Sequence, residues 1–227
     1  MKPFLALFFC FGIAANADEV ARKRVLILGD SISIGYTPPV REILKDTAVV
    51  VRPTTADGKA ENCDGTTKGV REIDRWLKLD GGKWAVIHFN FGLHDIKHID
   101  PKTKANSNDP SHARQAEPEI YERQLTEIAQ KLKATGAKLF FATTTPVPPG
   151  GVKPLRVVED VAQYNTIARR VMNANGIAVN DLYSFALPQL KEIQKPVDVH
   201  FTNEGSKQLA GEVARAIREA LRTDVKK

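Results

Sequence analysis

The sequence predicts an α/β fold: a three-layer α/β/α sandwich with a central parallel sheet. Short apolar runs rich in β-branched and aromatic residues alternate along the chain with longer segments of helical periodicity. Strands that alternate with helices form parallel sheets covered on both faces. The length of 227 residues fits one such domain with a sizeable core better than two small ones.

Five segments have the composition of buried strands, and each ends near a glycine or a polar residue. They are residues 23–28, 49–51, 84–91, 138–143 and 177–179. Strands of three to eight residues at this spacing leave room for a helical crossover between each pair. We therefore expect all five strands to run in the same direction.

Five helices are predicted between and after these strands, at residues 33–45, 68–79, 119–134, 157–175 and 202–221. Thr66 or Thr67 is a candidate N-cap for the second helix, and Thr202 for the last. Gly176 is the expected terminator of the fourth. The polar stretch 97–117 has no apolar periodicity and is longer than an ordinary connection, so we expect a lid or a substrate-side insertion there.

The N-terminus has the pattern of a secretory signal peptide. Lys2 precedes an apolar run that ends in the small residues Ala15 and Ala17, and the run is too short to span a bilayer. We expect cleavage near Ala17, export to the periplasm or the extracellular space, and a mature domain of residues 18–227. Cys63 is the one cysteine of that domain, so no disulfide is expected within it.

The charge pattern gives no sign of a nucleic-acid partner. The formal net charge is +6, but cations alternate with anions, as in VREIDRWLKLD, in place of a clustered basic stripe with stacking aromatics. We expect a mildly basic solvated surface, no nucleic-acid binding and no membrane insertion. Nothing in the sequence indicates an oligomeric state.

The first candidate for chemistry is Ser31, which directly follows the first strand. In open parallel sheets, ligands bind outside the carboxyl ends of the strands. A serine on a turn between a strand and a helix lies near backbone N–H groups and the positive end of the helix dipole. Ser31 is therefore either a nucleophile or the N-cap of the helix. The nucleophile elbow G-x-S-x-G is not met, because Ser33 stands at the second glycine position.

Four short motifs resemble those of the SGNH (GDSL-type) hydrolases, in the same order. They are GDSIS around Ser31, the glycine of ENCDGTT at Gly65, the segment GLHD at residues 92–95, and DVH at residues 198–200. The third has His94 where the family has asparagine, and the fourth has its aspartate one residue nearer to the histidine. The combination looks like an exported bacterial subgroup of this superfamily, and the resemblance implies a flavodoxin-like fold.

The resemblance also implies the roles of several residues. Ser31 is the expected nucleophile, and the oxyanion would be held by Ser31, Gly65 and His94, since a neutral imidazole can donate one N–H as an amide does. The further residues expected on the substrate side are Asp30, Tyr36 and Asp95, with Asp95 also holding its loop by hydrogen bonds to backbone N–H groups. No cofactor or metal is expected.

His200 is the expected general base, since histidine is the side chain best suited to accept the proton of a serine hydroxyl near neutral pH. Its second ring nitrogen needs an acceptor. Asp198 is the first candidate, because residues two apart in an extended segment share a side. Asp181, which follows a strand, and a backbone carbonyl in a Ser–His dyad remain as alternatives.

The activity that these residues predict is ester hydrolysis through an acyl-enzyme. The expected substrate is a small molecule or glycan, most simply a small-acyl ester or a carbohydrate O-acetyl ester. Lysophospholipase or thioesterase activity is an alternative, because the same fold hosts several hydrolases. A catalytically silent module that binds a glycan is the rival from another class, and a flavodoxin-like binder without hydrolytic activity is a third.

Overall fold

The computed structural model describes residues 22–222, and the predicted signal peptide lies outside this range. Within it, the sheet contains β1 (Lys23–Leu28), β2 (Ala48–Val51), β3 (Val86–Phe89), β4 (Lys138–Ala142) and β5 (Ala178–Asn180). The strand order is β2-β1-β3-β4-β5, and every neighbouring pair is parallel. The predicted fold class is confirmed.

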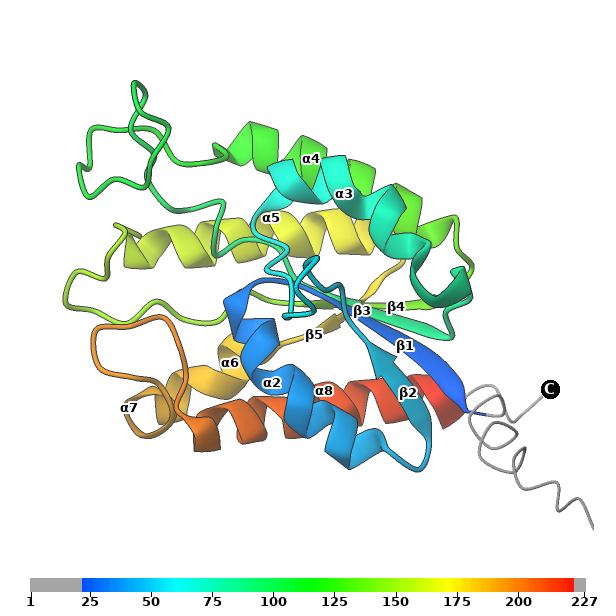
Figure 1. The fold of residues 1–227 in the computed structure, drawn as a ribbon. Coiled ribbons are helices and arrows are strands. Elements are labelled where there is room, and N and C mark those ends of the chain that lie inside the picture. The colour runs from blue at the N-terminus through cyan, green and yellow to red at the C-terminus, as the bar shows by residue number, and fades with distance from the viewer. Residues whose placement is uncertain (1–21, 223–227) are drawn as a thin grey trace, which may run out of the picture.

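Long helices cover both faces of the sheet. They are α2 (Ser31–Leu44), α3 (Thr66–Leu77), α4 (Pro118–Lys133), α5 (Val158–Asn175) and α8 (Asn203–Arg222). Figure 1 shows α3, α4 and α5 on one face and α2 and α8 on the other. Because both faces are covered, β3 is buried along its whole length and β1 over its last four residues.

Four short helical segments escaped the sequence prediction. They are η1 (Leu79–Gly81), α6 (Leu182–Ala186), η2 (Leu187–Gln189) and α7 (Leu190–Ile193). A helix of one turn repeats its apolar pattern too few times to show a periodicity. The last three carry the chain from β5 toward α8, so they decide where the segment before α8 lies.

The start of α3 also differs from the prediction. Its N-cap is Gly65, which has no side chain to offer, so neither Thr66 nor Thr67 is the cap. The carboxylate of Asp95 supplies the missing acceptor, because its Oδ1 accepts the Thr66 N–H at 2.8 Å. A side chain 29 residues further along the chain therefore caps this helix. Thr202 does act as predicted, accepting the Gly205 N–H at 3.0 Å.

Buried Arg52 joins three segments at the carboxyl end of β1. Its guanidinium donates to the Thr37 hydroxyl of α2 at 3.0 Å and to the carbonyl of Glu61 at 2.8 Å. It also reaches the carbonyl of Gly29 at 3.3 Å. A buried charge is tolerated only with such partners. The turn that carries Ser31 and the loop before α3 are thus held against each other.

The polar stretch 97–117 is tied to the neighbouring loop. The Leu155 carbonyl accepts the His98 N–H at 3.2 Å, and the Leu155 N–H donates to the Ser107 carbonyl at 3.1 Å. Arg114 forms two hydrogen bonds of 2.7 Å to Asp160. The stretch lies at the same end of the molecule as the carboxyl ends of the strands (Figure 1).

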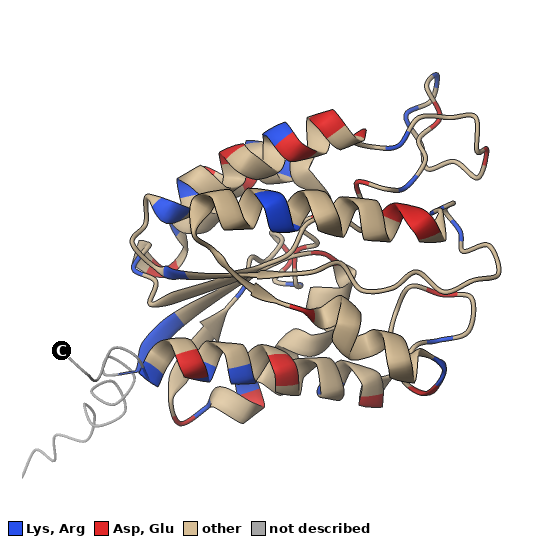
Figure 2. Cartoon of the chain, turned by 180° about the vertical axis from the view of Figure 1, so that it is seen from behind, with Lys and Arg blue, Asp and Glu red and all other residues tan. Residues whose placement is uncertain are grey.

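Charged residues of both signs are distributed over the helices, as the colours of Figure 2 show for the side of the molecule that carries α5 and α8. This agrees with the sequence expectation of a mixed surface. Within residues 22–222, no helix has the length and the apolar character needed to cross a membrane.

Candidate active site

The turn after β1 presents Ser31 at the start of α2. Asp30, and not Ser31, is the N-cap of this helix, because its Oδ1 accepts the Ile32 N–H at 2.9 Å. The capping alternative for Ser31 is therefore excluded. Ser31 is half-buried and belongs to the first helical turn, whose N–H groups have no partner within the helix. Its hydroxyl is left for another partner.

That partner is His200. The Nε2 of His200 lies 2.9 Å from the Oγ of Ser31, although the two residues are 169 positions apart in the chain. The Nδ1 of His200 lies 2.7 Å from the Oδ1 of Asp198, which also accepts the His200 backbone N–H at 3.0 Å. The structure thus brings serine, histidine and aspartate into one hydrogen-bonded line.

The carboxyl group of Asp198 is suited to be ionised beside His200. Partial burial alone would raise the pKa of Asp198, but the backbone and side-chain hydrogen bonds from His200 outweigh it and hold the pKa below its usual value. An ionised acceptor at Nδ1 fixes the proton on that nitrogen and leaves Nε2 free to accept from the serine.

Asp181 occupies a different place. Its Oδ1 accepts from the Thr143 hydroxyl at 2.9 Å and from the Ser184 N–H at 3.3 Å, which makes it the N-cap of α6. Its Oδ2 pairs with Arg169 at 2.7 Å. Both carboxylate oxygens are occupied away from His200, so Asp181 has a structural role here.

The loop that precedes α3 lies against the turn that carries Ser31. The Cys63 N–H donates to the Gly29 carbonyl at 3.1 Å, which places Gly65 two residues from this link. A Cβ at Gly65 would come within 2.7 Å of both the Asp95 carboxylate and the Gln115 amide. Only glycine fits this position, at the N-terminus of α3, without displacing the capping carboxylate.

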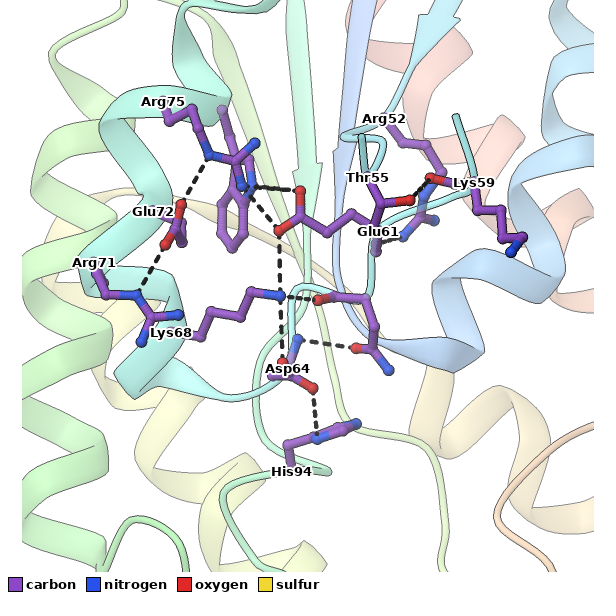
Figure 3. A network of polar contacts seen from close by, with 12 residues as sticks. Arg52, Thr55, Lys59, Glu61, Asp64, Lys68, Arg71, Glu72, Arg75 and His94 are labelled. Carbon is purple, nitrogen blue, oxygen red and sulfur yellow. Dashed lines mark hydrogen bonds and ion pairs between the residues drawn. The ribbon is translucent and has the colours of Figure 1, made fainter. Parts of the chain in front are cut away.

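His94 lies beside the loop that carries Asp64 and Gly65. Its Nδ1 is 3.2 Å from the Oδ1 of Asp64 and 3.3 Å from the Nζ of Lys97 (the Asp64 contact is drawn in Figure 3). Burial lowers the pKa of His94, so the neutral imidazole is favoured. The negative charge of Asp30, the neighbour of Ser31, also acts on this ring.

The three residues expected on the substrate side are all buried, and their contact with a substrate stays a prediction. Asp30 is 2% exposed and Tyr36 is 1% exposed. The ring of Tyr36 packs edge-on against His88 in the core. Asp95 is fully buried, and burial raises its pKa to about 7 even though Thr66 donates to it. Capping and core packing account for their positions, and the expected bond from a backbone N–H to Asp95 is confirmed.

An open cavity of about 510 Å³ adjoins Ser31 and His200. It is lined by the first turns of α2 and α8 and by the segment between α7 and α8, with Ile34, Phe201 and Ser206 among its walls. Lys195 and Lys207 also line it, and none of the described lining residues is acidic. The stretch 97–117 contributes no lining residue to this cavity, so the lid prediction finds no support in this conformation.

Arg156 was not predicted from the sequence as a residue of the site. A lone cation within the apolar segment PLRVV could have indicated a buried charge with a specific partner. Arg156 is buried, and its Nε donates to the Leu93 carbonyl at 2.8 Å. Burial lowers the pKa of Arg156, while the charges of Asp30 and Asp198 oppose this. Arg156 therefore feels the charges of both acids and is hydrogen-bonded to the loop that carries His94.

Cys63 and His88, two further residues whose side chains could take part in chemistry, have structural positions. Cys63 is buried, and burial raises its pKa to about 12, which suppresses the reactive thiolate. The Nε2 of His88 contacts Asn180 at 3.1 Å in the core. Nowhere in residues 22–222 do three His, Cys, Asp or Glu side chains gather in a way that could hold a metal ion.

Solved structures share this fold at low sequence identity. The lipase/acylhydrolase from Enterococcus faecalis matches with a TM-score of 0.68 and 17% identity, over 87% of this chain and 96% of that chain. The acetyl xylan esterase AlAXEase matches with a TM-score of 0.63 and 18% identity, over 86% and 99%. An acetyl-xylooligosaccharide esterase from Geobacillus matches with a TM-score of 0.64 and 17% identity, over 86% and 94%.

The comparison with protein families covers most of the chain, whereas no curated protein matches it. Residues 27–208 match the GDSL-like lipase/acylhydrolase family, and this range contains every residue of the Ser31–His200–Asp198 line. The chain is therefore a member of the GDSL-like lipase/acylhydrolase family, the SGNH superfamily that its four motifs resemble.

Proposed function

We propose that the protein is a serine esterase that forms an acyl-enzyme at Ser31. The observation that carries the proposal is the hydrogen-bonded line from Ser31 through His200 to Asp198. In the first step, His200 Nε2 takes the hydroxyl proton while Oγ attacks the acyl carbon. The tetrahedral intermediate collapses, and the alcohol leaves with the proton from His200. Water then releases the acid by the same steps in reverse.

The developing oxyanion has three donors in this proposal. They are the backbone N–H groups of Ser31 and Gly65, both at helix N-termini, and the Nε2–H of His94. Fixed donors aimed at the developing charge need no reorganisation during the reaction, and one such donor is worth about 10²–10³ in kcat. His94 thereby takes the part of the family's asparagine.

The proposed substrate is a small-acyl ester, and in particular an O-acetylated carbohydrate. The open cavity beside Ser31 supports this, since it has room for a sugar unit outside the reacting bond. The names of two similar structures, an acetyl xylan esterase and an acetyl-xylooligosaccharide esterase, point the same way. We also propose that the chain is exported, on the basis of the signal-peptide pattern in residues 1–17.

The test compares the wild-type protein with Ser31→Ala. We expect hydrolysis of p-nitrophenyl acetate by the wild type, a fall to background in the variant, and labelling of the wild type alone by a serine-directed phosphonate. Acetylated xylooligosaccharides should then be better substrates than a palmitoyl ester. An unlabelled wild-type protein that binds a glycan without cleaving any ester would instead support the silent binding module.

A further inference from the structure

The Nδ1 of His94 lies between an acid and a cation. Asp64 Oδ1 is 3.2 Å away and Lys97 Nζ is 3.3 Å away. A neutral imidazole has one proton, so Nδ1 either donates to Asp64 or accepts from Lys97. Figure 3 shows the other ring nitrogen of His94 turned away from Asp64. A hydrogen bond to Asp64 therefore requires the proton on Nδ1, whereas a hydrogen bond from Lys97 requires it on Nε2.

The tautomer decides whether His94 can stabilise an oxyanion. If Nδ1 accepts from Lys97, the proton stands on Nε2, which is then a donor. If Nδ1 donates to Asp64 in the neutral ring, Nε2 presents a lone pair, which repels a negative oxygen. An asparagine amide has no such alternative, so the question arises from the histidine itself.

We propose that Lys97 is a positioning residue that keeps the proton of His94 on Nε2, against the opposing pull of Asp64. The inference rests on the proposed oxyanion role of His94 and extends it to the two residues that control the ring. Lys97 is half-buried, which restricts its ammonium group to few partners. It lies three residues after His94, on the same loop.

Asp64 cannot simply turn away from the ring, because it is held on its other side. Its backbone has a φ of 55°, in the left-handed region, and its N–H donates to the Asn62 side chain at 2.9 Å. Lys68 lies 3.4 Å from its Oδ2 and 3.2 Å from the buried Glu61. Arg75 in turn donates twice to Glu61 at 2.9 Å (Figure 3).

Burial favours a neutral ring, which makes the tautomer the deciding variable. Burial is the largest influence that lowers the pKa of His94, and Lys97 and Arg156 act in the same direction. Asp30 and Asp64 act against them. The protonated ring would carry hydrogen on both nitrogens, and its Nε2 would donate whatever Lys97 does.

The tautomer can be observed directly, without any substrate. Long-range ¹⁵N–¹H correlation spectra distinguish a protonated Nδ1 from a protonated Nε2 in each histidine, and His94→Asn assigns the signals. In the wild-type chain we expect the His94 proton on Nε2, and in Lys97→Met we expect it on Nδ1. A wild-type proton on Nδ1, or a tautomer unchanged in Lys97→Met, would overturn the proposal even if the protein hydrolysed no ester.

Kinetics supply the second readout. Lys97→Met should lower kcat about tenfold or more with little change in KM, because an oxyanion exists only along the reaction path. In the His94→Asn background the same substitution should have no effect, since an amide has no tautomer. Lys102→Met, at an exposed position of the same loop, is the matched control. Equal losses in both backgrounds would show that Lys97 only supports the fold.

Asp64→Asn provides a rescue. Asparagine tolerates the left-handed backbone of this position, removes the carboxylate and offers an amide N–H to Nδ1. Added to Lys97→Met, it should restore most of the lost kcat. The deficit of Lys97→Met alone should also shrink as the pH falls and the ring becomes protonated. No recovery by either route would count against the proposal, whereas an inactive but correctly tautomerised wild type would count only against the proposed esterase.

Discussion

Asp181 and Asp198 both follow β5 in the chain, and their contacts separate them at the level of single residues. Asp198 faces the Nδ1 of His200 at 2.7 Å, whereas Asp181 caps α6 and pairs with Arg169. The spacing of D-V-H looked unfavourable in the sequence. The spacing nevertheless allows the contact, because the Asp198 carboxylate accepts hydrogen bonds from both the backbone N–H and the ring of His200.

Asp198→Asn should lower kcat by at least about a hundredfold, because the amide no longer fixes the histidine tautomer nor stabilises its charged form. Asp181→Asn is the matched control. It should leave kcat within about threefold and lower stability by at most about 1 kcal/mol, because asparagine still caps α6 and only the exposed ion pair with Arg169 is lost. Steady-state rates and urea unfolding of both variants check this. A fully active Asp198→Asn protein would favour a Ser–His dyad.

At the scale of elements, the site depends on how α3 begins. Asp95 caps α3 from outside the helix, and its Oδ1 receives both the N–H and the hydroxyl of Thr66. Its Oδ2 has no hydrogen-bond partner within the described residues. A buried carboxyl group with one unpartnered oxygen is easier to protonate, and its pKa rises from 3.8 to about 7.

This pKa makes the stability of the fold depend on pH. Between 3.8 and about 7 the folded chain keeps a proton on Asp95 that the unfolded chain has lost, so the contribution is largest below this window and is lost as the pH rises through about 7. Compared with Asp95→Asn, the wild type should therefore lose free energy of unfolding between pH 5 and pH 8. Urea denaturation at both pH values measures the difference. Parallel changes in the two proteins would contradict it.

At the scale of the whole molecule, the parallel sheet collects the site at one edge. The loops after β1, β2 and β3 carry Ser31, Gly65 and His94. Helix α8 packs beside α2 (Figure 1), and His200 lies just before α8 in the chain. The same packing opens the cavity between the first turns of α2 and α8. Its charged lining, Lys195 and Lys207, comes from the C-terminal part alone.

The cavity should favour esters that carry a negative charge on the alcohol side, such as acetylated uronates. Replacing both Lys195 and Lys207 with methionine should lower kcat/KM for an anionic ester about fivefold and leave a neutral ester nearly unchanged, since exposed charges contribute little each. Added salt should reduce the difference. The measurement is kcat/KM for the matched pair at low and high ionic strength. Equal losses for both esters would point to packing and not to charge.

The long elements could be read from the sequence because their signals are local. Apolar periodicity predicts α5 within one residue, and the run 23–28 coincides with β1. The short helices after β5 could not be predicted, because each has too few residues to show an apolar periodicity. The cap of α3 was also unreadable, because its acceptor comes from Asp95, far along the chain. The burial of Tyr36 was also unreadable, because its position close to Ser31 in the chain does not show that it packs in the core.

By itself, the sequence determined the fold class, the order of the strands and helices along the chain, and the residue types available for chemistry, because propensity and periodicity act over a few residues. The tertiary structure alone decided which of these residues meet. It brings His200 next to Ser31, and it places Asp198 beside His200 but Asp181 at the start of α6. It also brings both Asp64 and Lys97 close to the Nδ1 of His94. Such contacts depend on the packing of distant segments, which no local pattern encodes.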